Sequence, residues 1–98
     1  MLPKVIRVLG KPYKVEYSDS ITEFGLCDEA KQTIKIQKGM PPELEGDTLL
    51  HEAIHAIDFG MHTELTEKQV SALGSGLWAL LNDNPELVRY LTAKLKRR

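Results

Sequence analysis

Hydrophobic and polar positions alternate along the first third of the chain, and this period of two is typical of half-buried β-strands. Residues 5–9 and 13–17 are rich in β-branched and aromatic side chains, and the segment 10–12 between them contains glycine and proline. They predict a hairpin that opens a small antiparallel or mixed sheet. A short strand, a turn and a clearer alternating strand are then predicted at residues 24–27, 28–31 and 32–37.

The hydrophobic pattern changes to a helical period after residues 38–46, where two adjacent prolines interrupt regular structure. The first predicted helix covers residues 47–60, with Asp47 or Thr48 as its N-cap. One side of this helix is expected to be buried by its apolar side chains, which are Leu49, Leu50, Ala53, Ile54 and Ile57.

Two more helices are predicted downstream, and each has a start signal of its own. Thr66 and Gln69 fit a capping box, and leucines at helical spacing follow for several turns. Gly74 and Gly76 weaken this helix, which indicates that another backbone passes close to it. The third helix is expected to begin with Asn84 as its cap, and the leucines expected to face inward are Leu87, Leu91 and Leu95.

Strands followed by helices predict an α+β fold, and 98 residues suit a single domain that spans residues 1–98. The net charge of −1 gives no general attraction to nucleic acid or to an anionic membrane, so a protein or peptide partner is expected. The basic segment 94–98 is the one feature that suits nucleic acid, but the helix dipole alone also favours positive charge there.

The cellular compartment is suggested by what the chain lacks. No apolar run reaches the length of a membrane span, and the first residues have no signal-peptide pattern. Cys27 is the single cysteine, so it has no partner for an internal disulfide and is expected to be a small, partly buried side chain. A cytoplasmic protein is therefore expected, while its oligomeric state stays open.

One motif carries chemistry: residues 51–55 read His-Glu-Ala-Ile-His, an H-E-x-x-H pattern inside the first predicted helix. Residues four apart lie on the same face of a helix, so His51 and His55 can converge on one zinc ion. Glu52 would then take a proton from the water at the metal and pass it to the leaving amine of a peptide. Histidine is scarce, so a chance match is the minor alternative.

A catalytic zinc ion needs a third protein ligand, and the candidates follow His55. Glu67 is preferred because a tight loop can bring the start of the second helix back across the first. Glu64, in that loop, is the second choice. Asp58 is too far along a straight helix to share the ion. It fits better as an outer carboxylate that accepts the free N–H of a ligand histidine, or equally well as a solvated acid near the helix end. His62 is expected to be a loop histidine.

These features together resemble minimal single-domain gluzincin-type zinc metallopeptidases of phages and bacteria, related to the ImmA/IrrE-type and SprT-like families. The resemblance is carried by residues 25–28, 32–36, 48–58 and 65–81, of which only the H-E-x-x-H motif is specific. It implies a zincin-like fold, zinc held by two histidines and a helix-borne glutamate, and a substrate peptide along an edge strand. Here that edge would be Thr33–Gln37.

Two functions of different classes follow from this pattern. The first is a zinc-dependent endopeptidase that hydrolyses a protein substrate, with His51, His55 and Glu67 as zinc ligands and Glu52 as the base. The second is a non-catalytic module that binds a peptide or protein on the same scaffold, since a fold does not by itself imply catalysis.

Overall fold

The structure is a computed structural model, and it describes residues 1–96. It contains a four-stranded sheet with the strand order β1-β2-β4-β3. The strands are β1 Val5–Val8, β2 Lys11–Ser18, β3 Gly25–Asp28 and β4 Thr33–Gln37. The helices that follow are α1 Pro42–Met61, α2 Glu67–Asp83 and α3 Pro85–Lys94. A mixed sheet followed by three helices confirms the predicted α+β class.

The first hairpin turns at Leu9 and Gly10 rather than at residues 10–12 as predicted. Both residues have positive φ angles, of 52° and 83°, and Val8 pairs with Lys11 across the two-residue loop. Two consecutive positive φ angles are typical of a tight hairpin turn whose twist matches that of the strands. Pro12 is consequently part of β2, where its missing N–H is tolerated near the end of the strand.

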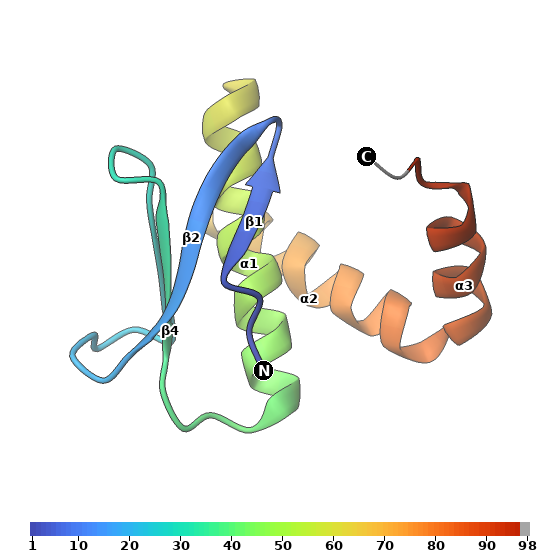
Figure 1. Cartoon of the computed structure of the whole chain (residues 1–98), viewed down its shortest axis with the longest axis horizontal. Helices are drawn as coiled ribbons and strands as arrows, with labels where there is room; N and C mark the ends of the chain where they lie inside the picture. Colours follow the sequence, from blue (N-terminus) through green and yellow to red (C-terminus); the bar gives the residue numbers. More distant parts are fainter. Residues whose placement is uncertain (97–98) are drawn as a thin grey trace.

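The core lies between one face of the sheet and α1, which covers that face (Figure 1). Tyr13 and Val15 of β2 and Ile34 and Ile36 of β4 point into this layer, and the two isoleucines are fully buried. Val15 and Ile34 are neighbours in the parallel pairing of β2 with β4. The predicted alternation of apolar and polar positions is therefore confirmed in β4 and in β2 as far as Val15, whereas Tyr17, the next apolar position on this face of β2, is 42% exposed.

The strand Thr33–Gln37 is not an edge strand, so the position predicted for it is wrong. This strand, β4, pairs with β2 on one side and with β3 on the other, which leaves β1 and β3 at the edges. A central place lets β4 bury both of its isoleucines completely. Strand order depends on long-range pairing that the alternation within a strand does not encode.

α1 begins earlier than predicted, at Pro42 instead of at residue 47, and Pro41 is its N-cap. A proline in the first helical position loses nothing, because the N–H groups of that turn have no partner within the helix. The helix therefore passes through Gly46, where the ring of Trp78 from α2 occupies the space of a Cβ. Trp78 is half-buried there and helps to hold α2 against α1.

α2 has the predicted capping box, in which Gln69 N–H donates to Thr66 Oγ1 and Thr66 N–H donates to Gln69 Oε1. The expected close approach of another backbone is confirmed at Gly74, where a Cβ would lie 3.3 Å from His51 Cα. It is wrong at Gly76, which has nothing within 4 Å of a Cβ.

α3 stands at the far end of α2, away from the sheet and from α1 (Figure 1). It contains no buried residue, and Leu91 and Leu95 are 44% and 68% exposed, so the expected inward stripe is wrong. Asn84 occupies the predicted cap position, but its side chain donates to the carbonyl of Leu80 and so closes α2 instead.

Two expectations concern the C-terminus and the membrane. In the basic segment 94–98, the last two residues, Arg97 and Arg98, lie outside the described residues. Among residues 1–96, no helix has the length and apolar character required to cross a membrane.

Candidate metal centre

α1 lies between the sheet and α2, and its two covered faces carry different chemistry. Thr48, Glu52 and Ala56 are spaced by one turn and are buried against the sheet. His51 and His55 occupy the adjacent face, which α2 partly covers. The side of this helix predicted to be buried included Ile57 but not Glu52. Both positions are wrong, because Glu52 is 6% exposed and Ile57 is 41% exposed.

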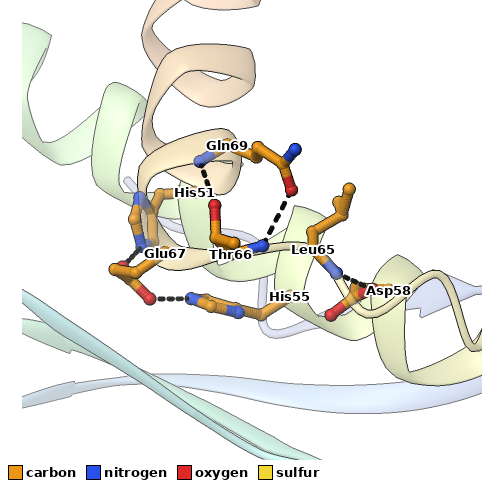
Figure 2. A network of polar contacts seen from close by, with 7 residues as sticks. All are labelled: His51, His55, Asp58, Leu65, Thr66, Glu67 and Gln69. Atoms are coloured by element: carbon orange, nitrogen blue, oxygen red, sulfur yellow. Dashed lines mark hydrogen bonds and ion pairs between the residues drawn. The ribbon is translucent and has the colours of Figure 1, made fainter.

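The structure brings together the two motif histidines and Glu67 (Figure 2). His51 Nε2 lies 2.6 Å from Glu67 Oε1, and His55 Nε2 lies 3.0 Å from Glu67 Oε2. One donor atom from each of the three side chains lies within 4.8 Å of the others. The two imidazole nitrogens therefore point at one small volume, and the carboxylate of Glu67 faces it from α2.

The other candidate ligands do not belong to this group. The Asp58 carboxylate accepts hydrogen bonds from the Thr63 hydroxyl and the Leu65 N–H, and these bonds hold the pKa of Asp58 below its ordinary value. The predicted role of Asp58 as acceptor for a ligand histidine is not the one seen here. Glu64 and His62 are exposed residues of the loop between α1 and α2.

The donor set suits a zinc ion. Two neutral imidazoles and one carboxylate are the ligands of many catalytic zinc sites, which keep a fourth position open. Zinc bonds of ~2.0–2.1 Å in a tetrahedron require ligand atoms roughly 3.3 Å apart. The three donor atoms lie within 4.8 Å of one another, so rotations of their side chains can bring them to that spacing. The residues present therefore fit a zinc ion, and they also suit other divalent transition metals.

Glu52 approaches the metal-binding group from the buried side of α1. The pKa of its carboxyl group is raised to about 7, mainly by burial; the neighbouring His51 opposes the rise, and the nearby Glu67 and Glu23 contribute to it. This carboxylate packs against Gly25 of β3, where a Cβ would lie 2.9 Å from Glu52 Oε2. Gly25 therefore makes room for Glu52.

Sequence reasoning missed Gly25 as part of the site. A glycine inside a predicted strand often marks a close approach of another group, and that signal was present between Phe24 and Leu26. The identity of the approaching group could only come from the packing of β3 against α1.

An open cleft of about 630 Å³ runs past the metal-binding group, between β3 on one side and α2 on the other. Its apolar walls include Phe24, Leu26 and Phe59, and the ring of Phe59 stacks on that of His55 with 6.2 Å between the ring centroids. Cys27 also lines the cleft, but burial raises the pKa of its thiol to about 12. Cys27 is therefore a protonated, partly buried side chain, as expected.

Comparisons of the chain with protein-family models, with curated proteins and with solved structures find no match.

Proposed function

We propose that this protein is a zinc-dependent endopeptidase. The observation that supports this best is the convergence of His51, His55 and Glu67 beside the buried carboxylate of Glu52, all at the wall of one open cleft. Three ligands of this kind hold zinc with one position left for water or substrate, which is the arrangement of catalytic rather than structural zinc sites. The zincin-like character of the fold is part of the same proposal.

In the proposed reaction the bound zinc ion and Glu52 have different roles. When bound, zinc supplies a Lewis acid that polarises the scissile carbonyl and activates water. Glu52 accepts the proton of the attacking water and later delivers it to the leaving amine. Its side chain is buried against Gly25 of β3 and lines the same cleft as the three metal-binding side chains.

The open edge of β3 is the best place for a substrate peptide, in place of the β4 edge expected from the sequence. Phe24 uses its carbonyl to accept the N–H of Gln37 on β4. Backbone groups alternate in direction along an antiparallel strand, so those of Gly25 and Cys27 point away from β4. A substrate strand added to this edge would gain main-chain hydrogen bonds regardless of its sequence.

The first test is metal content and peptide hydrolysis measured on the same purified preparations. We expect about one zinc per chain in the wild type and in Glu52→Gln, and none in His55→Ala. We expect Glu52→Gln to lose hydrolysis by about 10²–10⁴-fold, because only the proton transfer is removed.

Two results would contradict this proposal. Full hydrolysis by Glu52→Gln would exclude Glu52 as the base, and absence of zinc after zinc is supplied would exclude the metal centre. Zinc binding and tight peptide binding by the wild type without any cleavage would favour the non-catalytic binding module instead.

A further inference from the structure

Glu67 reaches the two histidines from a separate helix, and its side chain is poorly supported by packing. It is the first residue of α2 and is 68% exposed. A long exposed side chain loses substantial conformational freedom when it is held in one place, so its position must be set by its backbone. That backbone position depends on the loop of residues 62–66, which joins α1 to α2.

This loop has an uncommon backbone conformation. His62 and Glu64 have φ angles of 54° and 55°, in the left-handed region that residues other than glycine seldom adopt. Such a conformation is strained for a residue with a side chain, and it persists where the surrounding structure holds it. The contacts of the loop therefore decide whether α2 begins at the place that brings Glu67 to the histidines.

Asp58 supplies the contacts that hold the loop, and Figure 2 shows the one with Leu65. Asp58 Oδ1 accepts the hydroxyl of Thr63, and it also accepts the N–H of Leu65 at 3.1 Å. Leu65 is followed at once by Thr66, the N-cap of α2, and then by Glu67. Two hydrogen bonds thus tie the segment just before the cap to one carboxylate of α1.

Asp58 lies on the same helix as both histidines, because it follows His55 by three residues on α1. We propose that Asp58 is a positioning residue: it holds the loop so that Glu67 meets His51 and His55 in the geometry of a metal site. The inference rests on the metal centre of the proposed function, but it does not depend on peptide hydrolysis.

The test is zinc affinity, measured by chelator competition on Asp58→Ala, Glu67→Ala and the double variant, beside the absorption spectrum of the Co²⁺-loaded proteins. We expect Asp58→Ala to weaken zinc binding by about 10–100-fold, as for other residues that orient a ligand. In the Glu67→Ala background the same change should weaken binding no further, because Asp58 acts through Glu67. The Co²⁺ spectrum of Asp58→Ala should shift toward that of Glu67→Ala.

Three further variants separate positioning from general loss of structure. Asp58→Asn should keep the zinc affinity within about threefold of the wild type, because the Oδ1 atom of the asparagine can accept both hydrogen bonds. Thr63→Val, which removes one donor at nearly constant volume, should weaken binding less than Asp58→Ala does. Asn84→Ala is the control, because it also removes a side-chain hydrogen bond to the backbone, to the carbonyl of Leu80 at the far end of α2, and it should bind zinc like the wild type.

Several outcomes would overturn the inference. One is an Asp58→Ala protein, shown to be folded by circular dichroism, that binds zinc as tightly as the wild type. Another is that Asp58→Ala lowers the zinc affinity by the same factor in the wild type and in the Glu67→Ala background. Unchanged affinity in Glu67→Ala would remove Glu67 from the metal centre and the inference with it, whereas a protein that binds zinc but cleaves nothing would contradict only the proposed hydrolysis.

Discussion

The two ends of this molecule use similar apolar residues in different ways. In the sheet and α1, Ile34 and Ile36 are fully buried and form one layer with Tyr13. In the arm formed by the last turns of α2, by α3 and by the residues that follow it, α3 buries no residue, and four leucines are 40–68% exposed: Leu77, Leu80, Leu91 and Leu95. The candidate metal centre lies outside this arm, with two donors on α1 and one on the first turn of α2. The sheet, α1 and the start of α2 are called the body below.

This difference separates the body, which holds the buried core and the candidate metal centre, from the arm. The described metal-binding group and the walls of the cleft involve no residue of α3. α2 belongs to both regions, since Val70 is fully buried near its start while Leu80 is 46% exposed near its end. We therefore expect substitutions in the body to have large effects and those in the arm to have small ones.

The largest effect is expected from Ile36→Ala in the centre of the sheet. Removing a fully buried isoleucine side chain leaves a cavity and should lower the free energy of unfolding by about 2–5 kcal/mol. Leu91→Ala in α3 is the matched comparison and should change it by less than about 0.5 kcal/mol. Urea denaturation measures both, and equal losses would show that the arm is part of the cooperative core.

Gly25→Ala should impair catalysis more than stability. The added methyl group would meet the Glu52 carboxylate and the Thr48 side chain, and Glu52 would have to move. A displacement of about 1 Å of a catalytic group can lower the rate on the order of 10²-fold. We expect that loss in peptide hydrolysis with zinc content unchanged, and a fully active variant would show that β3 does not restrict Glu52.

Replacing either of two glycines of α2 with alanine should change the stability of the protein, but in opposite directions. Gly74→Ala brings a Cβ to 3.3 Å from His51 Cα, and pushing α2 away from α1 should cost about 1–3 kcal/mol. Gly76→Ala meets nothing within 4 Å and should stabilise the helix by roughly 0.5–1 kcal/mol. Thermal unfolding of the two variants, compared with the wild type, checks the signs, and losses of equal size would contradict the packing described here.

The smallest effect is expected from removing α3 with a stop codon in place of Pro85, which keeps Asn84 as the C-terminal cap of α2. Because α3 buries no residue, the free energy of unfolding should change by less than about 1 kcal/mol. Zinc content should stay at the wild-type level, as measured by elemental analysis. A large loss of either quantity would mean that the arm supports the body.

The sequence by itself determined those features that are encoded within a few residues of one another. The alternation in β2 and β4, the capping box of Thr66 and Gln69, and the H-E-x-x-H spacing were all readable without a structure. Glu67 was also found, because its place after a short loop limits how far it can lie from the motif helix. Such features depend on local backbone geometry, which repeats in every helix or strand.

Only the tertiary structure decided which elements become neighbours. It placed β4 in the centre of the sheet and β3 at the edge, it buried Glu52 against Gly25, and it left Leu91 of α3 exposed. It also gave Asp58 two partners in the loop instead of a histidine. An apolar or polar pattern states that a side chain can be buried or bonded, but its partner comes from a distant part of the chain, and long-range packing selects that partner.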